Sequence, residues 1–207
     1  MKSLKYLFAM TVLTAALTLS ASATFMIDTN PGGEKLFIDV ANKDVSDFQG
    51  FVGANNPGAP HVDIHTTGNV DTGSGFANIK PVKKGSLTVL TFTPENPDLF
   101  ADFSFRGQLL TDAGATVNVS VTDNLGNTQT FAFTGLGANA DFARQGIISL
   151  DGETIQSVTL MSDFKEVKQI EFSLAGAQVP DSGSTVMLLG VALGAAEVLR
   201  RLILKKR

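Results

Sequence analysis

The chain has 207 residues, which is enough for one domain with short terminal segments. It contains no cysteine, and this excludes a disulfide framework, a thiol nucleophile and a thiolate metal site. Residues 24–178 hold nine basic and 18 acidic residues, a formal charge of −9, so we expect no nucleic-acid partner.

The first 23 residues have the features of a secretory signal peptide. Lys2 and Lys5 give a positive start, an apolar run follows, and Ala21-Ser22-Ala23 forms a small-residue cleavage site. The alternative is an uncleaved membrane anchor, but the apolar run is short and ends in the A-x-A pattern. We predict a signal peptide over residues 1–23, with cleavage between Ala23 and Thr24.

Residues 24–178 show the pattern of short strands and turns. KLFIDVA places Leu36, Ile38 and Val40 on one face, and SLTVLTFTP does the same with Leu87 and Val89. The best-defined hairpin has Val117, Val119 and Val121 on one strand, a turn at residues 123–127, and Phe131 and Phe133 on the return. DFSFRGQLL, GETIQSVTLMS and VKQIEFSL are further strand candidates.

This spacing predicts an all-β fold, an antiparallel β-sandwich or jelly roll, as a single extracytoplasmic domain over residues 24–178. We expect about eight or nine strands, with phenylalanines filling the space between two sheets. The segment GANNPGAPHVDIHTTGNVDTGSG is rich in Gly, Pro, Asn and Thr. We predict long loops around one short strand there, and a binding surface or insertion.

VDTGSG, from Val70 to Gly75, contains the Asp-Thr-Gly-Ser fingerprint of pepsin-like aspartic proteases. That chemistry needs two carboxylates sharing a proton, and the chain has one copy of the motif. A dimer of the retroviral type could supply the second copy, but no apolar strand precedes the motif. We interpret it as a turn, and Asp71 as the only candidate for an enzyme.

HVDIH holds the only two histidines, and on a strand His61, Asp63 and His65 share one face. Positions i and i+4 of a strand lie about 13 Å apart, so the two histidines cannot meet on one metal ion. We interpret the three as the exposed face of an edge strand and predict no metal site. DTNPGGEKLFID matches a calcium loop only at Asp28, Asn30 and Asp39, so the question of a bound structural Ca²⁺ stays open.

Sugar-binding surfaces use Trp or Tyr rings, which offer an apolar face and a polar handle. The chain has no Trp, and its single tyrosine, Tyr6, lies in the signal peptide. Phenylalanine lacks the polar tip and is expected to be buried. This weakens a carbohydrate-binding function without excluding it.

The C-terminal stretch predicts a membrane helix. Residues 184–199 are apolar apart from Ser184, Thr185 and Glu197, and a helix of this length spans about 24 Å, short of the roughly 30 Å hydrocarbon core. We predict a transmembrane helix over residues 184–204, with Arg200 and Arg201 snorkelling to the cytoplasmic face. The basic cluster that stops it is Arg200, Arg201, Lys205, Lys206 and Arg207, the last three forming a tail over residues 205–207.

The pentapeptide Val179-Pro180-Asp181-Ser182-Gly183 precedes this helix. Pro180 and Gly183 favour an extended backbone open to close approach, which suits capture by a membrane protease. Motif, helix and basic end together resemble the C-terminal sorting signal of the PEP-CTERM class, in its VPDSG-CTERM variant. The resemblance covers residues 179–207. It implies an exosortase-type membrane protease as partner, in a Gram-negative bacterium that makes extracellular polysaccharide, and release to the cell surface or matrix.

Three hypotheses follow. The first is an exported, non-enzymatic protein, anchored transiently in the inner membrane and then sorted to the surface or exopolysaccharide matrix, with a structural or adhesive role. The second is a carbohydrate-binding module, with or without calcium, that uses residues 61–74. The third is an enzyme, which rests on Asp71 alone. We expect no enzyme activity and no cofactor.

Overall fold

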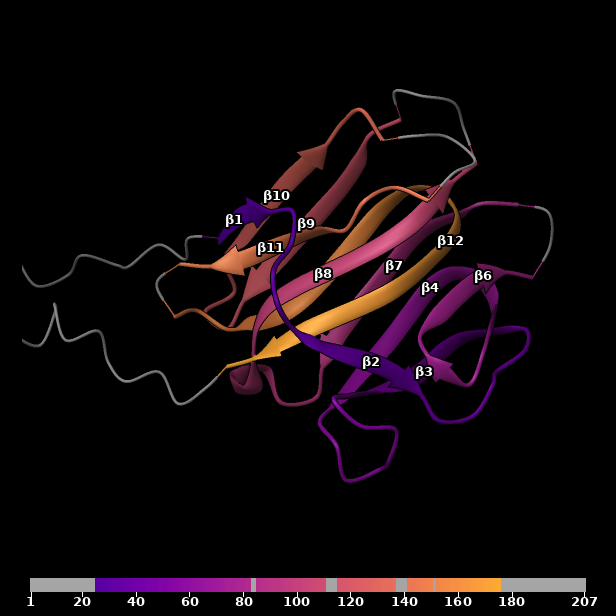
Figure 1. Cartoon of the computed structure of the whole chain (residues 1–207), viewed down its shortest axis with the longest axis horizontal. Coiled ribbons are helices and arrows are strands. Elements are labelled where there is room, and N and C mark those ends of the chain that lie inside the picture. Colours follow the sequence, from indigo (N-terminus) through magenta and orange to yellow (C-terminus); the bar gives the residue numbers. More distant parts are fainter. Residues whose placement is uncertain (1–24, 83–84, 111–114, 137–140, 151, 176–207) are drawn as a thin grey trace, which may run out of the picture. The chain divides into compact units, whose positions relative to one another are not determined.

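The computed structural model describes residues 25–82, 85–110, 115–136, 141–150 and 152–175 (Figure 1). The chain divides into one compact unit from Met1 to Leu174 and a second from Ala175 to Arg207. The predicted signal peptide and the whole predicted sorting signal, residues 179–207, lie outside the described residues. Within the described part of the chain, no helix is long and apolar enough to cross a membrane.

The described residues form twelve antiparallel strands and one 3-10 turn, η1 (Pro97–Leu99). The strands are β1 (Phe25–Asp28), β2 (Glu34–Ile38), β3 (Val45–Val52), β4 (His61–Thr72), β5 (Gly75–Phe76), β6 (Asn78–Pro81), β7 (Leu87–Pro94), β8 (Phe100–Leu109), β9 (Val117–Asp123), β10 (Thr128–Phe133), β11 (Gln145–Ser149) and β12 (Ile155–Leu174).

Strand β12 belongs to both layers of the fold. Its first part, residues 155–161, pairs with β9 on one side and β7 on the other. After a register shift between Met161 and Phe164, its second part pairs with β8 and, on the opposite side, with β6 and β2. The pairings join all twelve strands into one continuous sheet, which folds over at β12 into two layers that we call the first and second sheets (Figure 1). The first contains β10-β9-β12-β7-β4-β3 and the second β1-β11-β8-β12-β2. Further pairings of β2 with β3 and β5, and of β6 with β4 and β12, connect the two layers. The predicted all-β sandwich is confirmed.

Phenylalanine side chains fill the space between the two sheets. Phe92 of the first sheet lies 5.5 Å from Phe103 and 6.2 Å from Phe172 of the second, measured between ring centroids. Full burial of one such ring contributes roughly 1.5–3 kcal/mol. Ten of the fourteen described phenylalanines are buried, as the absence of a polar tip predicted: Phe25, Phe51, Phe92, Phe100, Phe103, Phe105, Phe133, Phe142, Phe164 and Phe172.

The predicted hairpin is confirmed, but two other strand faces were predicted wrongly. Val40 is 68% exposed, because β2 ends at Ile38 and the chain turns away from the core. In β7 the buried residues are Leu87, Leu90, Phe92 and Pro94, whereas Val89 is half-buried. Leu87 and Leu90 are three positions apart and both face inward, because the β7 pairing with β12 crosses the register shift.

The segment predicted as loops around one short strand contains β4, a strand of twelve residues. Its inward positions include Val62, Ile64 and Thr66, and its outward positions are polar. The alternation of inward and outward residues was not recognised in the sequence, because the outward positions are polar and two inward positions, Thr66 and Thr72, are threonines. The number of strands was also underestimated, and GETIQSVTLMS and VKQIEFSL form the single strand β12.

Residues 29–33, between β1 and β2, cross the outer face of the second sheet. Ser173 Oγ donates a 2.6 Å hydrogen bond to the carbonyl oxygen of Gly32. Gly33 packs on the β12 backbone, and Gly146 of β11 leaves room for Pro31, which a Cβ would displace. This crossing segment therefore covers part of the outer face of the second sheet.

Candidate functional site

Two rows of polar side chains cross the outer face of the first sheet. In the first row the strand pairing aligns Thr130 with Ser120, Ser120 with Thr159, Thr159 with Thr91, Thr91 with His65, and His65 with Asp47. All six side chains are exposed or half-buried. Hydrogen bonds join Ser120 to Thr130 at 2.8 Å and Thr91 to Thr159 at 3.1 Å. One side chain from each of six strands therefore forms a continuous polar line.

The second row lies two residues along the strands, about 6.7 Å from the first. It contains Thr128, Thr122 and Ser157, then Thr93, Asp63 and Gln49. The Thr122 and Thr128 hydroxyls are 2.9 Å apart, and Gln49 Nε2 donates to Asp63 Oδ1 at 2.8 Å. We call the two rows together the polar face. Its β10-β9-β12 half carries hydroxyls, and its β4-β3 half carries carboxylate, imidazole and amide groups.

The β4-β3 half of the polar face is hollowed. A cavity of about 420 Å³ is lined by Asp47, Gln49, Asp63, His65 and Thr93, with Phe48 and Ile64 beneath. The strand register puts Asp47 opposite His65 and Gln49 opposite Asp63, so these four side chains stand at the corners of a rectangle. Hydrogen-bond acceptors and donors therefore surround the cavity from three neighbouring strands, β3, β4 and β7.

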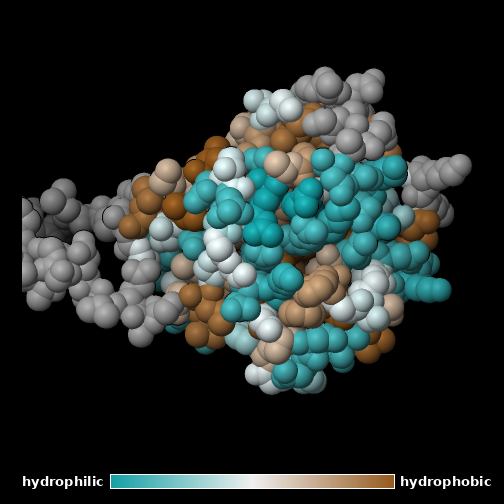
Figure 2. All heavy atoms as spheres, viewed as in Figure 1, coloured by the Kyte–Doolittle hydropathy of each residue, from teal (hydrophilic) through white to brown (hydrophobic). Residues whose placement is uncertain are grey.

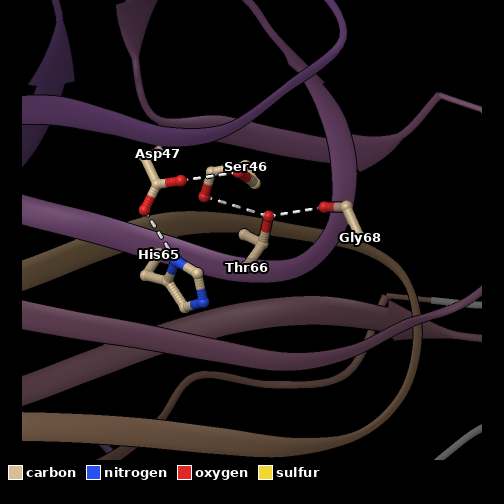
Figure 3. A network of polar contacts seen from close by, with 5 residues as sticks. All are labelled: Ser46, Asp47, His65, Thr66 and Gly68. Atoms are coloured by element: carbon tan, nitrogen blue, oxygen red, sulfur yellow. Dashed lines mark hydrogen bonds and ion pairs between the residues drawn. The ribbon is translucent and has the colours of Figure 1, made fainter.

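Short hydrogen bonds hold Asp47 in place (Figure 3). His65 Nδ1 lies 2.6 Å from Asp47 Oδ1, and Ser46 Oγ donates to Asp47 Oδ2 at 2.6 Å. The hydrogen bonds from Ser46 and from His65 lower the pKa of the Asp47 carboxyl below its usual value of 3.8. Asp47 therefore stays ionised at neutral pH, where it accepts hydrogen bonds and does not act as a general acid.

The strand beneath this network is fixed by a buried threonine. Thr66 is 1% exposed, and its hydroxyl donates to the carbonyl oxygen of Gly68 at 2.6 Å, with the carbonyl oxygen of Ser46 at 3.3 Å (Figure 3). These contacts tie β4 to β3 next to the His65–Asp47 pair. Because the supporting backbone is fixed, His65 and Asp47 are presented to solvent in a defined arrangement.

The structure places His61, Asp63 and His65 on one exposed face, as the alternation predicted. The edge-strand interpretation is wrong, because β4 pairs with β3 on one side and β7 on the other. His61 turns to Glu95, at 3.0 Å, and to the carbonyl oxygen of Pro57, at 2.9 Å. No cluster of three or more metal-ligating side chains occurs among the described residues.

The other two sequence candidates do not join the polar face. Asp71 lies near the end of β4 opposite Lys80, not in a turn as predicted, and its Oδ1 accepts a 3.1 Å hydrogen bond from the Asp44 backbone nitrogen. Asp28 of the calcium-loop match accepts from the Asn30 backbone nitrogen at 2.9 Å. Sequence reasoning missed the hydroxyl rows. Their signal was the recurrence of Thr or Ser two residues apart in LTVLTFTP, VNVSVTD and NTQTF, with an apolar residue between them in the first two segments.

The VPDSG-CTERM motif model matches residues 178–203. The chain carries a VPDSG-CTERM sorting signal. This is the C-terminal signal of PEP-CTERM-type exosortase substrates, and it indicates an exported, cell-surface protein. The match contains the predicted pentapeptide, residues 179–183, and most of the predicted helix.

No curated protein sequence matches the chain significantly. Among solved structures, the xylan-binding domain CBM22-1 of Paenibacillus barcinonensis Xyn10C aligns with a TM-score of 0.34 and 13% identity, over 72% of this chain and 99% of that one. The family 11 carbohydrate-binding module of Lic26A-Cel5E from Clostridium thermocellum aligns with a TM-score of 0.27 and 10% identity, over 75% and 96%. Scores this low carry no argument about what the present chain binds.

Proposed function

We propose that this chain is an exported surface or extracellular-matrix protein, processed by an exosortase-type protease and serving a structural or adhesive, non-enzymatic role in exopolysaccharide. The observation that carries the proposal is the VPDSG-CTERM match at residues 178–203. In this pathway residues 1–23 direct export. Residues 184–204 hold the protein in the inner membrane until the protease acts at residues 179–183.

The intact mass of the protein recovered from the surface of its native cells tests this proposal. A chain that begins at Thr24 and ends between Val179 and Gly183, with or without an added group, is the expected result. The substitution Pro180→Ala should retain the basic tail, whereas the distant surface substitution Leu125→Ala should not. A surface protein that begins at Thr24 and still ends at Arg207 refutes sorting and makes the chain a tail-anchored membrane protein.

Binding of polysaccharide is the second candidate function, and the polar face favours it. Sugar hydroxyls donate and accept hydrogen bonds, and carboxylate and amide side chains on adjacent strands can engage neighbouring hydroxyls. The rows cross six strands spaced about 4.8 Å apart, a length of roughly 24 Å, so an extended chain of several sugar units can lie along them. The cavity next to Asp63 gives this surface a recessed end.

Affinity electrophoresis in gels containing exopolysaccharide from the native cells tests the second candidate. Thr91→Val and Thr159→Val keep side-chain shape and remove the hydroxyls, so retardation in the gel should fall. Thr29→Val, on the segment that crosses the other sheet, is the matched control. A chelator arm shows whether calcium contributes. Equal retardation of all three variants refutes the role of the polar face and leaves the sorting proposal unaffected.

A further inference from the structure

Phe76 departs from the pattern of the other phenylalanines. It is 54% exposed, the only exposed phenylalanine among the fourteen that the structure describes. On β5 it pairs with Phe37 of β2, and the two ring centroids are 4.9 Å apart at 39°. Lys35 Nζ stands 4.3 Å from the centroid of the Phe76 ring. The Phe76 ring is thus held at the surface with the Phe37 ring packed against it and the Lys35 ammonium over its face.

A cavity of about 220 Å³ adjoins this ring. Its polar lining comes from Lys35, Arg144, Gln169 and Glu171, and Phe76 forms one wall. With roughly 30 Å³ for one water in the liquid, the volume corresponds to about seven waters. That is the scale of one sugar ring. We call this cavity the Phe76 pocket.

The far side of the Phe76 pocket is rigid. Both Arg144 terminal nitrogens bind the two Glu171 carboxylate oxygens at 2.8 Å, a bidentate pair in which Glu171 is 6% exposed. Arg106 Nη1 donates to Gln169 Oε1 at 3.1 Å, which orients the Gln169 amide nitrogen away from that contact. Gln169 has φ 49°, the left-handed region that side chains other than Gly rarely adopt. Such backbone strain concentrates at binding sites.

The charge of the pocket is opposite to that of the protein. Lys35 and Arg144 are two cations against the single carboxylate of Glu171. Hydrophilic side chains gather over β8 and β12 on this side of the molecule (Figure 2). Two nearby lysines have acidic partners on it: Lys168 of β12 lies 2.5 Å from Asp141, and Lys80 of β6 lies 3.6 Å from Glu166. Lys35 forms no ion pair with any described residue. It is therefore free to meet an anion from outside.

We propose that the Phe76 pocket binds a uronic acid residue, a pyranose ring that carries a carboxylate. The apolar face of the sugar packs against the exposed part of the Phe76 ring, and the carboxylate meets the Lys35 ammonium that lies over this ring. Gln169 and the exposed edge of Arg144 reach the ring hydroxyls. The inference rests on the proposed function in one respect, that exopolysaccharide supplies the ligand. It does not rest on the polar face, because the Phe76 pocket and the polar face share no residue.

Calorimetric titration of the full-length chain in non-ionic detergent tests the proposal. The ligands are a short oligogalacturonate and its methyl ester, which has the same rings without the charge. We expect the acid to bind about tenfold more tightly at low salt, and added salt to reduce this difference. The basic residues of the tail give the same background in every variant, so comparisons between variants remain valid.

Two variants and one matched control locate the site. Lys35→Gln should remove the preference for the acid, and Phe76→Ala should weaken both ligands by about tenfold. Lys165→Gln removes the same charge from an exposed position of β12 and should change neither affinity. The proposal is overturned by absence of binding, by equal affinity for acid and ester, or by equal effects of Lys35→Gln and Lys165→Gln. Correct surface processing alongside any of these outcomes would leave the sorting proposal standing.

Discussion

The bidentate pair between Arg144 and Glu171 offers a direct test of how the second sheet is stabilised beside the Phe76 pocket. Glu171 is 6% exposed and Arg144 is 27% exposed. The substitution Arg144→Met removes the ion-pair partner of a carboxylate that is only 6% exposed. Breaking a buried pair in this way costs about 3–5 kcal/mol, and the partial exposure of Arg144 places the expected loss near the lower end, about 3 kcal/mol.

The other two corners of the double-mutant cycle differ. Glu171→Gln leaves Arg144, which water reaches on one side, so we expect a loss of about 1–2 kcal/mol. Removing both partners leaves neither charge unpaired, and the double variant should lie within about 1 kcal/mol of the natural protein. The cycle then gives a coupling free energy of about 3–5 kcal/mol between the two side chains.

Urea unfolding followed by far-UV circular dichroism measures these losses. Fluorescence is unsuitable because the chain has no tryptophan and only one tyrosine, in the predicted signal peptide. A double variant that loses as much as the sum of the single variants would show no coupling and refute the reasoning. Arg144→Met with unchanged stability would refute it as well, since Glu171 would then be solvated by another route.

Three further predictions concern single positions. The hydrogen bond from Lys168 lowers the pKa of the Asp141 carboxyl below 3.8. The stabilisation that this ionised carboxylate contributes is therefore present above pH 3.8 and is lost as pH falls through its lower pKa in the folded protein. Lys168→Gln should bring the pKa of Asp141 back toward 3.8 in an NMR titration. Ser104 Oγ is buried without a described hydrogen-bond partner, so Ser104→Ala should raise the free energy of unfolding by about 1 kcal/mol, and a loss would show that the hydroxyl is satisfied. Gly146→Ala should lower the free energy of unfolding by about 1–3 kcal/mol, because a Cβ would lie 2.7 Å from a β8 carbonyl oxygen. The control Gly68→Ala, where a Cβ meets open space, should change it by less than about 1 kcal/mol. Equal melting temperatures of the two variants would contradict this prediction.

The local pattern of the sequence was sufficient where a strand faces the core on one side and water on the other. Val117, Val119 and Val121 are all fully buried, and their hairpin partner Phe133 is buried as well. The alternation failed at Val89, because a register shift in β12 decides which residues of β7 face the core. Such a shift depends on contacts between distant strands, and no local pattern in the chain records it.

The same limit explains what could be predicted of the polar face. The alternation placed His61, Asp63 and His65 on one exposed face, but it could not show what stands next to them. Asp47 lies 18 residues from His65, and Thr159 lies 68 residues from Thr91. In the sequence, each residue of a row is an ordinary exposed strand position. Only the order of the strands in the sheet brings these residues side by side.

Strand β12 connects the two proposed surfaces. Ser157 and Thr159 belong to the polar face on the first sheet, and Gln169 and Glu171 line the Phe76 pocket on the second. The strand passes from the first sheet to the second at the register shift after Met161, and Gln169, in the left-handed region, lies at a later shift in its pairing with β8. Because close-packed interiors transmit strain, we expect a change in the position of β12 at one surface to be felt at the other. A ligand that tightens the Phe76 pocket should therefore also reduce hydrogen exchange along residues 155–161, and a response confined to β2 and β5 would show that the two surfaces act separately.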